Sequence, residues 1–461
     1  MREQTLWAPR AWISGRWHEA VLLEVDAQGC WGAITSGFHS PPTGARRLAG
    51  PVLPGMVNAH SHAFQRAFAG LSERRETDAD DFWSWRDRMY RVALRITPEQ
   101  MRAVAAQLYL ELLRGGYTQV CDFHYLHHDP QGAPYADPAT MCWALADAAA
   151  DSGIGLSVLP VLYERAGFAV PTLRDDQRRF AGTPERVHWL MREVQDAKRM
   201  HVNAGVAIHS LRAASAASIT DLLRLVGDAP VPIHIHVAEQ TQEVEDCIAT
   251  TGLRPIAWLC ENLRPDARWQ LVHATHSTAA EIDVVARSGA GIVICPSTEG
   301  NLGDGLTDLD GWLSAGVPMA IGSDSHITRN WPEELRWLEY GQRLARRQRN
   351  VAAAPGLGQA SSAARLFDAA LSAGANAASQ TRWGLVPGAR ADALVLDPRA
   401  PALLGIPASH TLDALVFAGG EPMLHQVMVA GQVVMRDGHH AQEELIAGRF
   451  TAVMNTLWAQ M

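Results

Sequence analysis

Between residues 52 and 326, short apolar runs alternate with longer amphipathic stretches. This alternation predicts parallel strands connected by crossover helices. Eight runs have the length and composition of strands: 52–60, 117–124, 154–162, 204–210, 231–237, 269–274, 290–295 and 317–323. Because eight such strands can close on themselves, the pattern predicts an α/β fold, a (β/α)₈ TIM barrel.

One predicted helix carries clear start and stop signals. Thr97 is followed directly by Pro98 and, three residues after Thr97, by Gln100, which gives an N-cap, a proline at the first helical position and a capping-box partner. Gly115 and Gly116 are expected to end this helix just before the strand at 117–124.

The two chain termini are rich in short strand-like runs and turns, for example at 11–15 and 425–431. Two such pieces flanking one barrel most simply pair with each other as a small β-sandwich built from both termini. We therefore predict three regions. They are 1–51 for the N-terminal part of the sandwich, 52–384 for the barrel, and 385–461 for its C-terminal part with a terminal helix.

Composition narrows the class of protein. With 461 residues, 47% hydrophobic and 19% charged, the chain resembles a soluble globular enzyme. A net charge of −9 without a basic block gives no support for nucleic-acid or membrane partners, so we expect a small-molecule substrate. The N-terminal stretch lacks a signal-peptide core and six scattered cysteines lack a CxxC pair, which predicts a cytoplasmic protein with reduced thiols.

Candidate metal ligands lie where five of the predicted strands end, the position at which barrel enzymes carry their working residues. His60 and His62 are two apart on a strand, so both imidazoles project from the same face. The later strand ends carry His209, His234, His236, Glu239, His273 and Asp324. A structural role would explain any one of these residues alone. Their joint occurrence at barrel spacing favours a metal site.

In these positions the chain resembles the amidohydrolase superfamily, whose distorted (β/α)₈ barrels carry HxH after strand one, histidines after strands five and six, and an aspartate after strand eight. The resemblance covers nearly the whole chain. Residues 54–60, and 295–298 with Asn301 and Leu302, fit its deaminase branch. The fourth strand does not end in the lysine that bridges two metals in binuclear members, so the resemblance implies one divalent metal ion per subunit.

The resemblance also implies roles for individual residues. His60, His62, His236 and Asp324 would bind the metal, while Glu239, His273 and Asp324 would be the catalytic residues. Three nitrogens and one carboxylate oxygen suit Zn²⁺, although Fe²⁺ would accept them too. Asp324 would accept the proton of the attacking water, Glu239 would protonate the leaving nitrogen, and His273 would polarise the attacked group. His234, one layer deeper, is assigned to packing.

Three further stretches, 62–70, 82–86 and 123–129, resemble the formimidoylglutamate deiminases of this superfamily. The resemblance implies hydrolysis of N-formimino-L-glutamate to N-formyl-L-glutamate and ammonia in histidine degradation, by a homodimer. A substrate with two carboxylates calls for arginines and neutral donors. The candidates for binding it are Gln65, Arg86, Tyr125, His209 and Arg212.

Alternatives remain open at this point. Arg86 could pack on Trp83 or Trp85, and Arg212 could be a solvated loop arginine. The enzyme could instead deaminate a heterocycle such as guanine, cytosine or a triazine, or the barrel could be a non-catalytic module. A second metal site at 127–129 is disfavoured, because neighbouring residues on a strand point to opposite faces.

Overall fold

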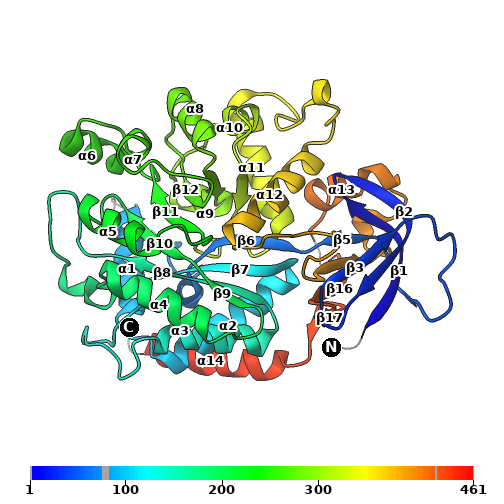
Figure 1. The fold of residues 1–461 in the computed structure, drawn as a ribbon, viewed down its shortest axis with the longest axis horizontal. Coiled ribbons are helices and arrows are strands. Elements are labelled where there is room, and N and C mark those ends of the chain that lie inside the picture. Colours follow the sequence, from blue (N-terminus) through cyan, green and yellow to red (C-terminus); the bar gives the residue numbers. More distant parts are fainter. Residues whose placement is uncertain (1–2, 75–81, 421–422, 460–461) are drawn as a thin grey trace.

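A computed structural model describes residues 3–74, 82–420 and 423–459, without the side chains of 82–84. The described residues form a parallel barrel surrounded by helices, with a second sheet at one side of it (Figure 1).

The barrel contains eight parallel strands that pair in chain order. They are β6 (Met56–Ser61), β7 (Tyr117–His124), β8 (Gly155–Leu162), β10 (Val206–Ser210), β11 (Ile233–Val237), β12 (Trp269–His273), β13 (Gly291–Ile294) and β14 (Met319–Ile321). A short strand, β9 (Val202–Ala204), also pairs with β8. All eight predicted strands are present, which confirms the predicted barrel.

Helices connect the strands and cover the outside of the barrel (Figure 1). They are α1 (Phe82–Ala93), α2 (Pro98–Arg114), α3 (Thr140–Ser152), α4 (Pro184–Asp196), α5 (Ala216–Val226), α6 (Thr241–Thr251), α7 (Pro255–Leu263), α8 (Ala279–Ser288), α9 (Pro296–Leu302), α10 (Leu309–Ser314), α11 (Trp331–Arg346) and α12 (Ser362–Ala377). The predicted capping box is confirmed. Gln100 N donates to Thr97 Oγ1 at 3.3 Å, and Thr97 N donates to Gln100 Oε1 at 3.0 Å. Gly115 caps the C-terminal end of α2, as predicted.

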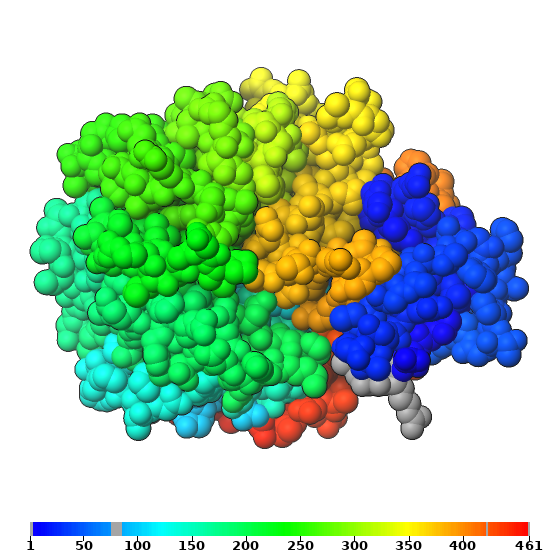
Figure 2. Space-filling model, in the orientation of Figure 1, coloured from blue at the N-terminus to red at the C-terminus, as the bar shows by residue number. Residues whose placement is uncertain are grey.

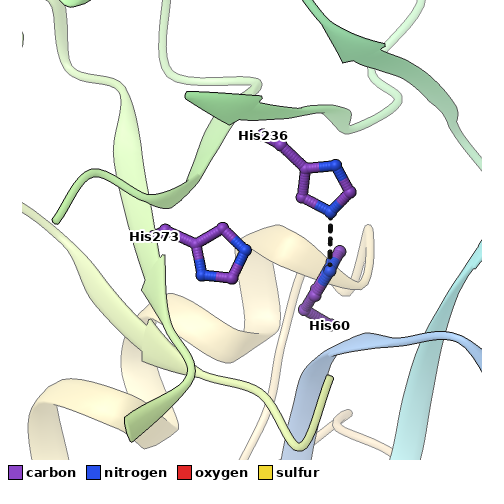
Figure 3. A group of neighbouring side chains, drawn as sticks. All are labelled: His60, His236 and His273. Atoms are coloured by element: carbon purple, nitrogen blue, oxygen red, sulfur yellow. Dashed lines mark hydrogen bonds between the residues drawn. The ribbon is translucent and has the colours of Figure 1, made fainter. Parts of the chain in front are cut away.

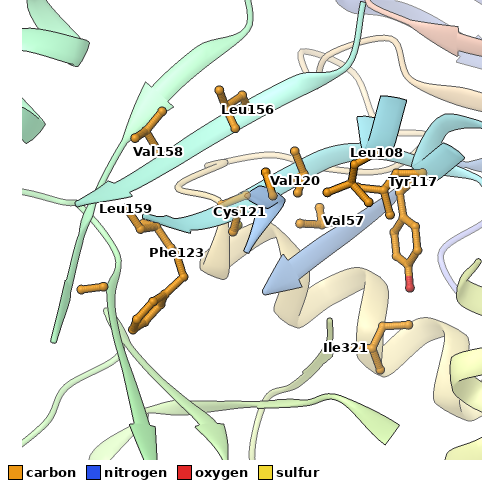
Figure 4. Close-up of a cluster of buried hydrophobic side chains, with 14 of the residues drawn as sticks. Val57, Leu108, Tyr117, Val120, Cys121, Phe123, Leu156, Val158, Leu159 and Ile321 are labelled. Carbon is orange, nitrogen blue, oxygen red and sulfur yellow. The ribbon is translucent and has the colours of Figure 1, made fainter. Parts of the chain in front are cut away.

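Apolar side chains fill the layer between strands and helices (Figure 4). Every position of β7 and β8 is buried, as expected for parallel strands that are covered on both faces. Val120 and Leu156 on these strands and Leu108 on α2 are completely buried. The barrel wall is therefore a rigid support for groups that lie at the strand ends.

The last turn of α12 fills the end of the barrel where the N-terminal ends of its strands lie. Its carbonyl oxygens at Ala377 and Ala378 accept hydrogen bonds, 2.9–3.4 Å long, from four different strands. The donors are Cys121 Sγ, Ser157 Oγ, Asn203 Nδ2 and His234 Nε2. His234 thus contacts the floor of the barrel, which agrees with the packing role expected for it.

The second sheet joins strands from both termini in the order β18-β17-β16-β15-β5-β1-β2-β3, with β4 beside β1. Their bounds are β1 (Gln4–Ile13), β2 (Arg16–Val25), β3 (Trp31–Thr35), β4 (Arg46–Arg47), β5 (Val52–Pro54), β15 (Ala393–Leu396), β16 (Leu424–Val429), β17 (Gln432–Arg436) and β18 (His439–His440). In Figure 2 the blue N-terminal segment lies against the orange one. The pairing of both termini is therefore confirmed.

The predicted strand at 52–60 is in fact divided between the two sheets. Residues 52–54 form β5, which pairs with β15 and β1, and the chain enters the barrel only at Met56. Between them, a Cβ on Gly55 would lie 2.1 Å from Thr118 Oγ1, so only glycine fits at this crossing. The sheet built from the termini thus extends three residues past the expected boundary at 51.

The C-terminal helix α14 (Glu443–Ala459) packs along α2, beneath the barrel in Figure 1, and α13 (Thr411–Phe417) packs on α11 and α12. Among the described residues, no helix has both the length and the apolar character required to span a bilayer.

A buried side-chain pair closes the barrel between β6 and β14. Asn58 Nδ2 donates to Ser323 Oγ at 2.7 Å, and Asn58 Oδ1 accepts from Ser323 N at 2.9 Å. Next to this pair, Asp324 N donates to His60 O at 3.0 Å. The seam therefore fixes the end of β6 against the segment that follows β14.

We expect Asn58→Ala to lower the free energy of unfolding by about 2–3 kcal/mol, because it leaves the buried Ser323 N without a partner and removes one of the two hydrogen bonds of Ser323 Oγ. Urea unfolding curves measure the change. Asn262→Ala, on the exposed face of α7, is the control, with an expected change below about 0.5 kcal/mol. Equal effects of both substitutions would contradict a structural role for the seam.

Candidate metal centre and substrate pocket

Four predicted metal ligands converge at the end of the barrel where the C-terminal ends of its strands lie. His60 Nε2 lies 3.0 Å from His236 Nε2 and 3.4 Å from Asp324 Oδ1. His62 Nε2 lies 3.3 Å from the same carboxylate oxygen. Figure 3 shows the rings of His60 and His236 with their nitrogens facing each other and His273 beside them. The barrel thus brings three strand ends to one point.

The donor set fits a single divalent ion with four protein ligands and a further position left for water. Two nitrogens bound to Zn²⁺ at about 2.0–2.1 Å lie roughly 3–3.5 Å apart, close to the separations found here. His62 Nδ1 donates to Phe123 O, and His236 Nδ1 donates to His209 O, each at 2.9 Å. Because these bonds occupy Nδ1, the Nε2 lone pairs are directed at the common centre, as metal-binding histidines require.

The electrostatics of these residues favour metal binding. Burial lowers the pKa of His60 to about 3 and also lowers the pKa values of His62 and His236, so all three imidazoles are neutral at pH 7. Burial alone would raise the pKa of Asp324, but its hydrogen bond with His60 and the nearby imidazoles hold that pKa below its usual range. Neutral imidazoles and an ionised carboxylate are the protonation states that bind metal ions.

A histidine and a glutamate lie beside this centre. His273 Nε2 is 3.8 Å from Glu239 Oε1 and 3.9 Å from Asp324 Oδ2. Burial would lower the pKa of His273, but Glu239, Asp324 and Glu299 together raise it to about 10. Burial also raises the pKa of Glu239. A protonated imidazole therefore faces two carboxyl groups, an arrangement able to move protons during a reaction.

Glu299, at the start of α9, was missed by the sequence analysis. Its Oε1 accepts from His273 Nδ1 at 3.3 Å and from Cys295 N at 3.0 Å. It is only one residue past the stretch 295–298 that was noted as deaminase-like. Nothing in a single sequence distinguishes this glutamate from an ordinary first-turn residue of a helix.

A pocket opens above the centre, and all five predicted substrate-binding residues line it. They are Gln65, Arg86, Tyr125, His209 and Arg212. The same pocket is lined by His62, His236, Glu239, His273 and Asp324. The sequence analysis missed Met89, Tyr90, Tyr163, Phe180 and Leu302. Apart from Leu302, these are large buried side chains near the upper rim, whose sequence pattern is that of core residues.

The two arginines hold different positions in the pocket wall. Arg86, on α1, lies over the ring of Tyr90 with Cζ 5.6 Å from its centroid, so aromatic packing and a place in the pocket occur together. The Trp83 side chain lies outside the described residues. Arg212 is only 7% exposed, so the alternative of a solvated loop arginine is wrong. Its Nη2 is 3.8 Å from Glu239 Oε2, next to the candidate catalytic groups.

Three other histidines near the site have structural partners. His127 Nε2 donates to Val161 O at 2.9 Å and His128 Nε2 donates to Ala181 O at 2.8 Å, so the two rings face different carbonyls. Among the described residues, no candidate metal-binding group includes either of them. His326 Nε2 donates to the carbonyl of the candidate ligand His62 at 3.0 Å, which braces this part of the candidate metal centre.

Comparison with known proteins agrees with the family that the sequence resembles. The profile of the Amidohydrolase family matches residues 52–434. The chain belongs to the amidohydrolase family. This membership confirms the predicted superfamily. The chain is 46% identical over 456 residues to formimidoylglutamate deiminase of Pseudomonas aeruginosa, covering 98% of this chain and 99% of that protein.

Solved structures of this fold extend the comparison. An amidohydrolase from Brucella melitensis matches 99% of this chain and 100% of its own, with a TM-score of 0.93 and 40% identity. An adenosine deaminase from Xanthomonas campestris, solved with bound zinc, matches 99% of this chain and 98% of its own, with a TM-score of 0.80. At 22% identity, the second similarity shows the fold alone.

We expect elemental analysis of the purified protein to find one divalent metal ion per chain. His236→Ala should abolish metal binding, because it removes one of the converging nitrogens. His234→Gln is the matched control, two residues earlier on β11. Its side chain can still donate to Ala377 O, so the metal should be retained. Metal loss from His234→Gln together with retention by His236→Ala would contradict this assignment.

Proposed function

We propose that the protein hydrolyses the formimino C=N bond of N-formimino-L-glutamate and releases N-formyl-L-glutamate and ammonia, as a step of histidine degradation. The observation that carries the proposal is the joint lining of one pocket by a metal-binding set and two arginines, Arg86 and Arg212. The relative that is 46% identical over nearly the full chain supports the same substrate.

We also propose Zn²⁺ as the metal, bound by His60, His62, His236 and Asp324, with Fe²⁺ acceptable to the same ligands. For the assembly and its location we propose a cytoplasmic homodimer that acts on a small dicarboxylate and has neither nucleic acid nor membrane as a partner.

The pocket is suited to a dianionic substrate although the chain carries a net charge of −9. A guanidinium pairs with a carboxylate through two parallel hydrogen bonds and keeps its charge at every physiological pH. Gln65 adds a polar group, since Gln65 Nε2 donates to Tyr125 OH at 3.2 Å and Gln65 Oε1 lacks a partner among the described residues. These groups could orient the substrate with its formimino carbon toward the metal centre.

Two side chains then carry the proton transfers, and a third stabilises the charge that develops. When bound, a divalent cation acidifies water and polarises the atom under attack. Asp324 accepts the proton of the attacking water, while His273 donates a hydrogen bond to the charge that develops at the reacting centre. Glu239 delivers one proton to the departing nitrogen, and the hydroxyl group formed by the attack supplies the second, so the tetrahedral carbon collapses to the formyl carbonyl with expulsion of ammonia. The proton held by Asp324 then returns to Glu239 and restores both side chains. The burial that raises the pKa of Glu239 favours its protonated form for this role.

We expect N-formimino-L-glutamate to be the best substrate in a panel assay for ammonia release that includes guanine, cytosine and a triazine. The reason is that the two arginines of the pocket can pair with the carboxylates of this substrate, whereas a neutral ring offers them no charged group. A higher kcat/KM for any of the rings would contradict the proposed substrate. Absence of turnover with the whole panel would favour a non-catalytic barrel.

We expect Glu239→Gln and Asp324→Asn to lower kcat by about 10²–10⁴-fold, the usual contribution of a positioned acid or base. Metal content must be measured in parallel, because Asp324 is also a candidate ligand. Glu245→Gln, exposed on the neighbouring helix α6, is the control and should retain full activity. Near-normal turnover by either site variant with metal bound would exclude the assigned role.

We expect Arg212→Ala to raise KM for the dicarboxylate by at least about tenfold, since a charge-assisted hydrogen bond contributes roughly 1.5–3 kcal/mol. Steady-state kinetics with N-formimino-L-glutamate measure the change. Arg268→Ala, just before β12 at the opposite end of the barrel, is the control. An unchanged KM would remove Arg212 from substrate recognition.

A further inference from the structure

Gln177, Tyr90 and Tyr163 form a hydrogen-bonded group at the wall of the pocket. Gln177 belongs to the 3₁₀ helix η2 (Asp175–Phe180) and is completely buried. Its Nε2 donates to Tyr90 OH at 3.1 Å and to Tyr163 OH at 2.9 Å. Both tyrosines line the pocket, whereas Gln177 lies behind them. None of these three residues has a part in the proposed catalytic steps.

The orientation of the Gln177 amide is fixed from its other side. Arg174 N donates to Gln177 Oε1 at 3.1 Å, so a flipped amide would place its NH₂ group against another donor. The amide therefore presents only N–H groups to the two phenols. Each phenol oxygen accepts one of these hydrogen bonds, and its own proton must point elsewhere.

The hydroxyl protons of Tyr90 and Tyr163 can point into the pocket. Within the described residues, the two hydroxyls donate to no protein acceptor other than each other. Within the pair, one hydroxyl can donate its proton to the other. The second hydroxyl then still has its own proton to donate, so at least one O–H remains for a ligand. Burial, assisted by the Tyr90 hydroxyl, raises the pKa of Tyr163 well above its ordinary value, so Tyr163 keeps its proton.

The tyrosines lie at the end of the pocket remote from the metal centre. Adjacent rings lead there from the candidate ligand His236: its centroid is 5.1 Å from that of His209, which is 4.3 Å from that of Tyr163. The ring of Phe180 packs on Tyr163 at 5.4 Å, on Tyr90 at 5.6 Å and on Tyr125 at 5.0 Å, so it joins the two tyrosines to the side of the pocket formed by Tyr125. The Arg86 guanidinium over Tyr90 adds a positive charge to this remote end.

We propose that Tyr90 and Tyr163, oriented by Gln177, form with Arg86 the specificity site for the substrate carboxylate that lies farthest from the reacting carbon. The inference rests on the proposed function for the rest of the substrate. A carboxylate only accepts hydrogen bonds and so matches O–H and guanidinium donors at every contact. A carboxamide in the same place would turn an NH₂ group toward one of these donors. The site therefore distinguishes a glutamate-like from a glutamine-like ligand, with Gln177 as a positioning residue.

Calorimetric binding of N-formyl-L-glutamate and N-formyl-L-glutamine to the metal-loaded, full-length protein tests the proposal without requiring turnover. We expect the wild-type protein to bind the carboxylate at least about 100-fold more tightly. Tyr90→Phe and Tyr163→Phe should each reduce that ratio by about tenfold, because each removes a hydrogen bond to a charged group. Tyr135→Phe is the matched control. Its hydroxyl accepts from Arg179 outside the pocket, and the ratio should not change.

Substitution of Gln177 tests the orientation. In Gln177→Glu the new carboxylate accepts from both phenols, so their protons turn away from the pocket and their lone pairs face the ligand. The affinity for N-formyl-L-glutamate should fall by about 100-fold or more, and by more than in the near-isosteric Gln177→Met. Thermal melting curves establish that each variant is folded. A larger loss in Gln177→Met than in Gln177→Glu would overturn the role of the amide.

The remaining outcomes separate this inference from the proposed function. Equal losses of affinity for both ligands in the phenylalanine variants would show that the tyrosines only shape the pocket, and would overturn the specificity site. Lack of any wild-type preference for the carboxylate would overturn it as well. The proposed function fails separately, when the wild-type protein releases no ammonia from N-formimino-L-glutamate.

Discussion

The burial of three imidazoles against one carboxylate is the constraint on which the site depends. His60, His62, His236 and Asp324 are each at most 6% exposed, and their polar atoms face one another rather than water. Lone pairs that converge in this way are stabilised by a proton or a cation between them. The seam between β6 and β14 matters for the same reason, since it holds the segment bearing Asp324 against the segment bearing both histidines of β6.

The other end of the pocket is held by different means. Its residues come from α1, from η2 and from Tyr163 directly after β8, and a buried guanidinium connects η2 to the rest of the rim. Arg179 is completely buried and donates to the carbonyls of His128 at 2.8 Å and Ile96 at 2.9 Å. One side chain thus links η2 to the segment after β7 and to the loop that follows α1. The reacting end rests on strands, while the recognition end combines a residue after β8 with two helices joined to it by hydrogen bonds.

The sequence predicts the metal-binding end of the pocket better than the end that contains Tyr90 and Tyr163. The eight strands and their terminal histidines could be found, because strand length, register and residue type determine which side chains reach the upper end of a barrel. The break at Gly55 could not, since it depends on the position of Thr118 on a neighbouring strand. Tyr90, Tyr163, Gln177 and Glu299 also escaped prediction. Their roles arise from contacts between segments far apart in the chain, and their local sequence is that of ordinary helix and core residues.

The last turn of α12 closes the barrel at the N-terminal ends of its strands, and this closure bears on how the reaction products leave. Ala377 and Ala378 are hydrogen-bonded to four strands, so this end of the barrel is closed by protein. The substrate pocket opens at the other end, where the C-terminal ends of the strands lie. In a deiminase of the proposed kind, ammonia is set free at the deep end, behind the larger formylated product. Among the described residues, the pocket above the candidate metal centre offers both products one shared opening.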